Sequence, residues 1–314
     1  MPSTVDSAVE RLRAVPAPVQ GALYMVAAAL GFSVMNVAIR IAADELNPLQ
    51  IAFFRNFFAM LVMLPWLQQA GLASLKTEHM GLHLWRAVIG LLAMSTWFFS
   101  IALLPLADAV ALNFTVPMFA TVGAALVLGE IVRARRWSAT VVGFLGVLII
   151  LRPGFTELTP AMALPVISAA FMAISILIVK RLSGYDSPNA IVFMMNLLLT
   201  PLSLVPALFV WRWPSWTVLG LMLLVGVFAA LSHIAITRAY TKADASALLP
   251  LDYARLPFIA LFAYFFFAEV PDLWTWVGAA VIAGSAIYIA RREAQVAKER
   301  AASRAASHAP AARP

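Results

Sequence analysis

The sequence predicts an all-α membrane protein of ten transmembrane helices, arranged as two inverted repeats of five. Hydrophobic residues make up 63% of the 314 positions and charged residues 12%. This charged fraction is about half the roughly 25% that is typical of a soluble domain. The apolar residues form runs of about twenty, the length that crosses roughly 30 Å of hydrocarbon as a helix. The chain has no Cys, which excludes disulfides, thiolate nucleophiles and Cys-based metal sites.

Breaks rich in polar residues or Pro separate the apolar runs, as at Asp44-Glu45-Leu46-Asn47-Pro48. These breaks are too short for a catalytic domain outside the membrane. The first run is too long for a removable signal peptide and lacks a cleavage site. Residues 1–18 and 294–314 are expected to be cytoplasmic tails, the second of them disordered. The expected spans are 19–42, 47–69, 82–103, 107–129, 135–151, 161–182, 188–210, 215–240, 245–268 and 273–290.

The distribution of basic residues predicts the orientation. If the N-terminus is inside, 17 of the 22 Lys and Arg residues, Lys76 and Arg86 among them, fall at cytoplasmic ends and three at outer ends. The positive-inside rule therefore places both termini in the cytoplasm. The net charge of +7 belongs to these ends, so nucleic-acid binding is not expected.

The two halves repeat an ordered series of residues. Arg40, Pro48, Phe53 and Asn56 recur 140 positions later as Lys180, Pro188, Phe193 and Asn196; Gly90 and Asp108 recur 136 positions later as Gly226 and Asp244. Each half also has a Glu that closes its fourth span, Glu130 or Glu269. Five spans are an odd number, so the second copy enters the membrane from the opposite side. Inverted repeats of this kind are common in secondary transporters, with the substrate site at mid-membrane between the halves.

The ends of the two halves resemble a known family. The first ends in Gly129-Glu130, Arg135-Arg136-Trp137 and Gly143 to Gly154; the second ends in Ala268 to Asp272, Gly278-Ala279-Ala280, Tyr288 and Arg291-Arg292-Glu293. These runs resemble the drug/metabolite transporters of the EamA type. The resemblance covers about residues 19–293 and implies repeats at 19–154 and 155–293. It also implies that the first four helices of each half surround the centre.

Two further runs resemble one bacterial branch of that family. Phe54-Arg55-Asn56 and Leu251 to Pro257 are similar to carriers of amino acids, S-adenosylmethionine and riboflavin. The resemblance implies transport of a small polar or aromatic metabolite (amino acid, nucleoside-like or vitamin-like) across the bacterial inner membrane, by alternating access. It leaves the substrate and the direction open, and it implies no cofactor.

Arg55 is one of the few charged residues inside a span. It lies seven residues into the second helix, roughly 10 Å from its start. A guanidinium at that depth is costly unless it faces protein, water or an anion. Two readings stay open: Arg55 reaches the outer interface or pins Asn56, or it attracts an anionic part of the substrate.

The ninth helix carries the second group of charges. Asp252 and Arg255 are three residues apart and share a face, and Pro257 frees backbone carbonyls nearby. We expect Asp252, Tyr253 and Arg255 to bind substrate, although a structural ion pair also fits. Proton coupling, if present, is expected at Asp252, with His233 as a second possible relay.

Several uncharged residues complete the predicted substrate site. Asn113 and Thr115 precede Pro117 in the fourth span, where their polar atoms either bind substrate or satisfy backbone groups around a kink. Asn36 and Asn196 either face the centre or form interhelical hydrogen bonds. Trp97 either stacks on a planar substrate or packs in the core.

Other functions fit the sequence less well. Neither Ser95 nor Ser232 lies in a Gly-x-Ser-x-Gly elbow, so an enzyme is not expected, and His79 and His83 have ligand spacing but lack a third metal ligand. A scaffold needs no buried Arg or Asp, and a channel usually repeats a charged ring. Small residues in the fifth and tenth helices fit either packing within the chain or a homodimer seam. The expected partners are therefore a small-molecule substrate and the lipid bilayer, and a homodimer through the fifth and tenth helices stays open.

Overall fold

The computed structural model describes residues 17–127, 134–152, 159–182, 184–240, 255–285 and 287–288. Within these ranges every regular element is helical. The labelled helices are α2 (Ala17–Ala42), α3 (Pro48–Ala70), η1 (Leu72–Leu75), α4 (Met80–Leu103), α5 (Leu106–Asn113), α6 (Val116–Val127), α7 (Ala134–Leu151), η2 (Pro160–Met162), α8 (Ala163–Leu182), α9 (Pro188–Leu208), α10 (Trp216–Tyr240) and α12 (Arg255–Phe267). A further apolar helix runs over Leu273–Ser285.

Six of the described helices are long and apolar enough to cross a membrane: Val19–Ala42, Pro48–Ala70, Met80–Leu103, Pro160–Val179, Asn189–Leu208 and Trp216–Ile236. Four shorter apolar stretches, Leu106–Ala120, Val141–Ile150, Arg255–Phe267 and Leu273–Ser285, fall where the remaining spans are expected. The helices begin and end at the polar and proline-containing breaks of the sequence. For example, Asn47 caps α3 by accepting a hydrogen bond from the Leu49 amide at 3.0 Å, with Pro48 in the first turn, where its missing N–H costs nothing.

The fourth span is divided, which the sequence analysis did not predict. α5 ends at Asn113 and α6 begins at Val116. Pro117 therefore lies in the first turn of a new helix, where proline is tolerated, and does not kink a continuous one. The Thr115 hydroxyl donates to the Leu112 carbonyl at 2.9 Å, which satisfies a backbone group freed by the break.

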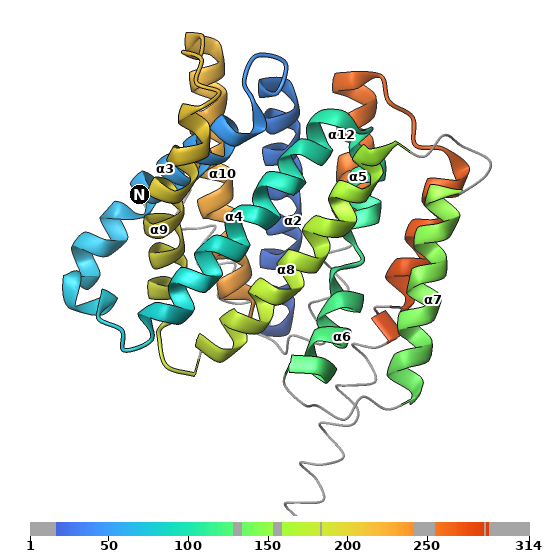
Figure 1. Cartoon of the computed structure of the whole chain (residues 1–314), viewed down its shortest axis with the longest axis horizontal. Coiled ribbons are helices and arrows are strands. Elements are labelled where there is room, and N and C mark those ends of the chain that lie inside the picture. The colour runs from blue at the N-terminus through green and yellow to red at the C-terminus, as the bar shows by residue number, and fades with distance from the viewer. Residues whose placement is uncertain are drawn as a thin grey trace, which may run out of the picture.

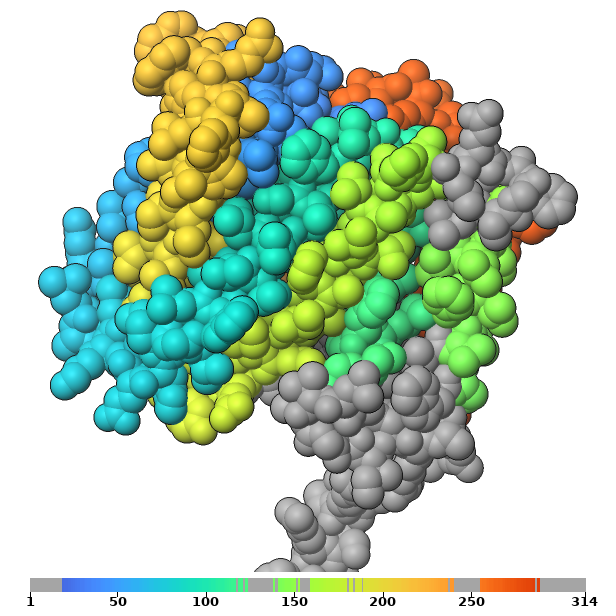
Figure 2. Space-filling view, viewed as in Figure 1, coloured from blue at the N-terminus to red at the C-terminus, as the bar shows by residue number. Residues whose placement is uncertain are grey.

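The helices pack in pairs that join the first half of the chain to the second. α2 packs on α10 and α4 on α8; α3 packs on α10 and α4 on α9; α2 packs on α12 and α6 on α8. Two further pairs are α3 with α9 and α5 with α12. α4 and α8 run side by side across the front, and α7 stands at the edge (Figure 1). In the space-filling view α9, α4 and α8 cover this face together (Figure 2).

Glycines permit the closest of these contacts. A Cβ on Gly226 would lie 2.4 Å from Phe58 Cβ and 2.9 Å from the Ala59 amide nitrogen, so α10 touches the backbone of α3. A Cβ on Gly31 would lie 2.3 Å from Ser232 Oγ, between α2 and α10. These two glycines hold α10 tightly against both α2 and α3.

The small residues of the fifth and tenth expected spans pack within the chain. A Cβ on Gly146 would lie 2.9 Å from the Gly278 carbonyl, and one on Gly278 would lie 2.6 Å from the Gly146 carbonyl. Gly284 has no neighbour within 4 Å of its ideal Cβ among the residues that the structure describes. The expected homodimer through these helices is untested and stays a prediction.

The Gly226 contact predicts a difference between two alanine variants of α10. Gly226→Ala forces α10 away from the α3 backbone, and overpacking of this kind costs about 1–3 kcal/mol. Gly220→Ala is the matched control because no atom among the described residues lies within 4 Å of its ideal Cβ and alanine favours helix by up to about 1 kcal/mol. In detergent, Gly226→Ala should lower the unfolding midpoint and Gly220→Ala should keep or raise it. Equal midpoints would show that the contact does not limit stability.

Candidate functional site

Arg55 is buried in the helix bundle, with 6% of its surface exposed. Its Nη1 atom donates to the side-chain oxygen of the next residue, Asn56, at 2.8 Å. Its Nη2 atom lies 3.2 Å from His233 Nε2 on α10. Arg55 therefore does not reach the interface, and neutral groups of two helices fix the orientation of its guanidinium.

His233 is the acceptor in its contact with Arg55. A guanidinium has only donors, so Nε2 accepts and the ring is neutral in this arrangement. The edge of the ring meets Phe32 of α2, with centroids 5.2 Å apart and planes at 82°. The guanidinium groups of Arg55, Arg86 and Arg255 all act electrostatically on this ring. A proton on His233 would add one more positive charge to this group of cations, so its predicted relay role needs a different arrangement and stays a prediction.

Asn56 extends the cluster to two more helices. Its amide nitrogen donates to Ser203 Oγ on α9 at 3.3 Å and contacts the Met94 sulfur on α4 at 3.7 Å. Asn56 is fully buried, and its amide uses both its oxygen and its nitrogen. It therefore links Arg55 to α4 and α9.

The start of α12 meets the same region through α2. The Arg255 guanidinium carbon lies 4.9 Å from the Phe32 ring centroid, a cation–π distance, and Ser33 Oγ donates to the Arg255 carbonyl at 3.5 Å. The structure thus places Arg255 in the same region as Arg55 and His233, and the predicted substrate-binding role of these residues stays a prediction. Asp252 and Tyr253 lie outside the described residues, so their substrate-binding role, and proton coupling at Asp252, stay predictions.

Other predicted residues are buried but bond elsewhere. Asn113 donates to the Pro165 carbonyl at 3.2 Å, and Asn196 donates to the Val192 carbonyl at 3.2 Å and contacts the Met63 sulfur. Trp97 packs in the hydrophobic core. Asn36 is 1% exposed, and its side-chain oxygen has no partner among the described residues. The side-chain oxygen of Asn196 is likewise buried without a partner among the described residues, so Asn36 and Asn196 each keep one unsatisfied acceptor.

Arg86 is a residue of this region that the sequence analysis misplaced. It was counted with the cytoplasmic charges, but it lies six residues into α4, is 8% exposed and donates to the Ile191 carbonyl of α9 at 3.0 Å. It acts electrostatically on Arg55 and on His233. Its position inside an apolar run indicated that Arg86 is buried, but the count of basic residues at helix ends did not consider this depth.

Ion pairs close the end of the bundle where α2 finishes and α3 begins, called here the α2/α3 end. Arg40 donates to the carbonyls of Ile101 and, at 2.8 Å, Leu104 at the end of α4, and its Nη2 lies 3.5 Å from Glu269 Oε1. The other Glu269 oxygen accepts from the Leu106 amide at 2.8 Å. Glu269 is thus not a solvated turn residue, because it ties the end of α12 to α2 and α5.

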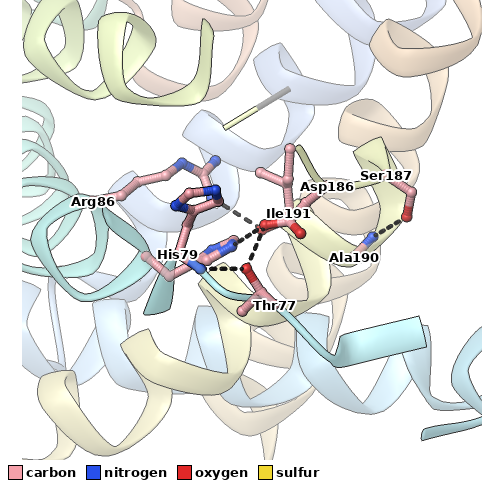
Figure 3. A network of polar contacts seen from close by, with 8 residues as sticks. Thr77, His79, Arg86, Asp186, Ser187, Ala190 and Ile191 are labelled. Atoms are coloured by element: carbon pink, nitrogen blue, oxygen red, sulfur yellow. Dashed lines mark hydrogen bonds and ion pairs between the residues drawn. The ribbon is translucent and has the colours of Figure 1, made fainter. Parts of the chain in front are cut away.

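A second polar network lies at the opposite end, called here the α3/α4 end, and joins the loop after α8 to the start of α4 (Figure 3). The Asp186 carboxylate lies 2.8 Å from His83 Nε2 and accepts from Thr77 Oγ1 at 2.9 Å. The His79 and Tyr185 rings are tilted by 44° to each other, with centroids 3.9 Å apart. Within the described part of the chain, no three His, Cys or acidic side chains are placed to hold a metal ion.

Comparisons with known proteins agree with these features. The model of the EamA-like transporter family matches twice, at residues 19–152 and 159–291. A riboflavin transporter of Vibrio cholerae is 38% identical over 281 residues, which are 88% of this chain and 94% of the relative. An S-adenosylmethionine uptake transporter of Rickettsia bellii is 29% identical over 257 residues, 82% of this chain and 88% of the relative. One crystal structure superimposes with a TM-score of 0.59 at 16% identity, covering 85% of this chain and 98% of its own, which shows likeness of fold alone.

Six described helices are long and apolar enough to cross a membrane, and charged side chains buried between such helices are typical of functional sites. The chain belongs to the EamA-like transporter family. It is therefore an inner-membrane protein that transports a small metabolite, and it is not an enzyme.

The polar network at the α3/α4 end should make the unfolding stability of the protein depend on pH. Burial raises the pKa of Asp186, but the hydrogen bonds from His83 and Thr77 outweigh it and leave the pKa below its usual value. A lowered folded pKa stabilises the fold above the unfolded value of about 3.9 and loses this effect as the pH falls through the folded value. Asp186→Asn should therefore lower the unfolding midpoint at pH 7 by a few degrees, and the difference should shrink below about pH 4.

The control for Asp186 is Asp44→Asn, which changes an exposed carboxylate at the other end of the bundle. Its midpoint should follow the wild-type value at every pH. A difference between Asp186→Asn and wild type that persists unchanged to pH 3 would show that ionisation of Asp186 is not what stabilises this end.

Proposed function

We propose that this protein is a secondary transporter for riboflavin, or for a similarly planar metabolite rich in acceptor oxygens, and that it works by alternating access. The observation that carries the proposal is the buried Arg55, which neutral Asn56 and His233 hold in place between helices of both halves. A charged side chain buried in a membrane span is costly and usually has a function. Since relatives of this chain include riboflavin transporters, we infer that Arg55 binds the substrate.

The ten-span inverted repeat is part of the proposal, and the helix packing supports it. Matching the first to fifth expected spans with the sixth to tenth pairs α2 with α8, α3 with α9 and α4 with α10. Under this matching the α2–α10 contact has its counterpart in α8–α4, and α3–α10 has its counterpart in α9–α4. The contact of α2 with α12 corresponds in the same way to that of α8 with α6. The double family match supports repeats near 19–154 and 155–293.

The orientation and the access cycle extend this proposal. With both termini inside, the α2/α3 end faces the periplasm and the α3/α4 end the cytoplasm. Each end joins the two halves, through the Arg40–Glu269 ion pair at one and the contact between His83 Nε2 and the Asp186 carboxylate at the other. A part-exposed ion pair such as Arg40–Glu269 is worth roughly 1 kcal/mol or less, so a rocking cycle can break the contacts of one end at a time.

The substrate class follows from donor chemistry together with the relatives. Arg55 offers N–H groups in a planar fork, which suits a carboxylate or a pair of carbonyl oxygens on a flat ring. A riboflavin ring carries such carbonyls, whereas S-adenosylmethionine carries a carboxylate. The higher identity to the riboflavin transporters, 38% against 29%, favours the flavin.

Counterflow in proteoliposomes tests the proposed substrate, because it needs no coupling ion and no known direction. Vesicles loaded with unlabelled riboflavin should accumulate labelled riboflavin in the presence of the purified protein. Arg55→Gln should reduce the initial rate at least tenfold, a loss of about 1.4 kcal/mol or more. Arg152→Gln, which removes an ion pair with Asp272 remote from the site, should keep most of the rate. Counterflow of S-adenosylmethionine without riboflavin counterflow would reassign the substrate, and no counterflow of either would reject both.

Labelling of a single introduced cysteine tests the access cycle, because the natural chain has none. Ser33→Cys places a thiol at a fully buried position beside the cluster. Adding Arg40→Gln removes the clamp at the α2/α3 end, so a membrane-impermeant maleimide applied from the periplasmic side should react several-fold faster. The control pairs Ser33→Cys with Arg152→Gln. Equal rates in all three proteins would show that the Arg40 clamp does not govern access.

A further inference from the structure

Arg86 is a second buried guanidinium, on the α3/α4 side of the bundle. It comes from α4, roughly 9 Å along the helix from Met80, and 8% of it is exposed. One of its N–H groups donates to the Ile191 carbonyl at 3.0 Å. Its Nε atom is fully buried and has no hydrogen-bond partner among the described residues. Figure 3 shows Arg86 and Ile191 beside the network of the α3/α4 end.

Arg55 and Arg86 are paired differently from Arg40 and Arg152, two half-buried cations of the described chain. Arg40 and Arg152 each have a carboxylate partner. Neither Arg55 nor Arg86 has an ion pair with a described carboxylate, and the two act on each other as like charges. Two like charges that only neutral groups among the described residues contact are unfavourable in an apolar surrounding.

A purely structural role does not account for Arg86. Its bond to the Ile191 carbonyl ties α4 to α9, but that needs one donor, whereas a guanidinium carries five in a fork. A shorter neutral donor would do the same without the charge. Residues that cost stability in this way are typical of functional sites.

We propose that Arg86 is a specificity-determining residue that binds the substrate together with Arg55, and that the pair holds a group with at least two acceptor oxygens. This rests on the transport function proposed above. The acceptor group is either the carbonyl edge of a neutral planar ring or an oxyanion such as a carboxylate. Asn56 and His233 occupy only part of the Arg55 fork, so both guanidinium groups keep N–H donors for the substrate.

The test compares stability and binding in the same full-length protein. Arg86→Met removes the charge at similar volume, and Arg86→Lys keeps the charge without the fork. The probes are riboflavin, followed by quenching of its fluorescence, and sodium citrate, followed by the shift in unfolding midpoint. Arg152→Met is the matched control, because it also removes a guanidinium but breaks the pair with Asp272.

We expect Arg86→Met to unfold at the wild-type temperature or higher without ligand and to bind riboflavin at least tenfold more weakly. Arg86→Lys should bind with intermediate affinity. Arg152→Met should show the reverse pattern, with a lower midpoint and unchanged binding. This opposite sign separates a binding residue from one that only holds helices together.

The outcomes distinguish a failure of the Arg86 inference from a failure of the proposed riboflavin transport. If Arg86→Met binds riboflavin as wild type does and unfolds at a lower temperature, Arg86 only pins α4 to α9 and the inference fails while riboflavin transport stands. If wild type binds citrate and not riboflavin, and Arg86→Met loses citrate, the inference stands and the flavin is rejected. If wild type binds neither probe, the inference is overturned together with the proposed substrate.

Discussion

The cost of a guanidinium inside an apolar helix bundle governs the arrangement of the centre. Arg55 is buried, so its N–H groups need hydrogen-bond acceptors on neighbouring residues. The Asn56 side-chain oxygen accepts one hydrogen bond on the same helix, and His233 Nε2 accepts another because α10 lies against α3. That approach depends on Gly226, whose missing side chain lets the two backbones meet. One glycine thus connects helix packing to the geometry of the site.

The protein treats its cations differently at the ends and at the centre. At the ends, Arg40 and Arg152 pair with Glu269 and Asp272, in positions partly open to water. Such pairs exchange readily with water and suit contacts that form and break. At the centre, Arg55 and Arg86 meet only neutral groups among the described residues. Neutral partners orient a guanidinium without cancelling its charge, which leaves its attraction for a substrate intact.

The sequence predicted the parts of the fold that depend on apolar run length. The ends of α2, α4 and α10 fall within a few residues of the expected spans, because each is set by a local break. It did not predict the split after Asn113, because one proline is compatible with a kink or with a new helix. The contact between Arg55 and His233 joins residues 178 positions apart, and no local pattern fixes such a pairing. Arg86 was misplaced because a count of basic residues treats all positions near a helix end alike, whereas burial depends on which face meets α9.

The proposed repeat duplicates the ends of the protein but not its centre. In sequence, Arg40 corresponds to Lys180 and Glu269 to Glu130, so the residue types of the Arg40–Glu269 pair recur in the other half. By the same offsets, Arg55 corresponds to Met195, Arg86 to Met222 and His233 to Trp97. A symmetric pocket would place equal charges on both halves and bind a substrate in two orientations. Arg55 and Arg86 come from α3 and α4 of the first half, and Arg255 is the one described guanidinium that α12 of the second half brings to the same region. Under the proposed transport function, this unequal distribution of charge suits a planar molecule with acceptor oxygens along one edge.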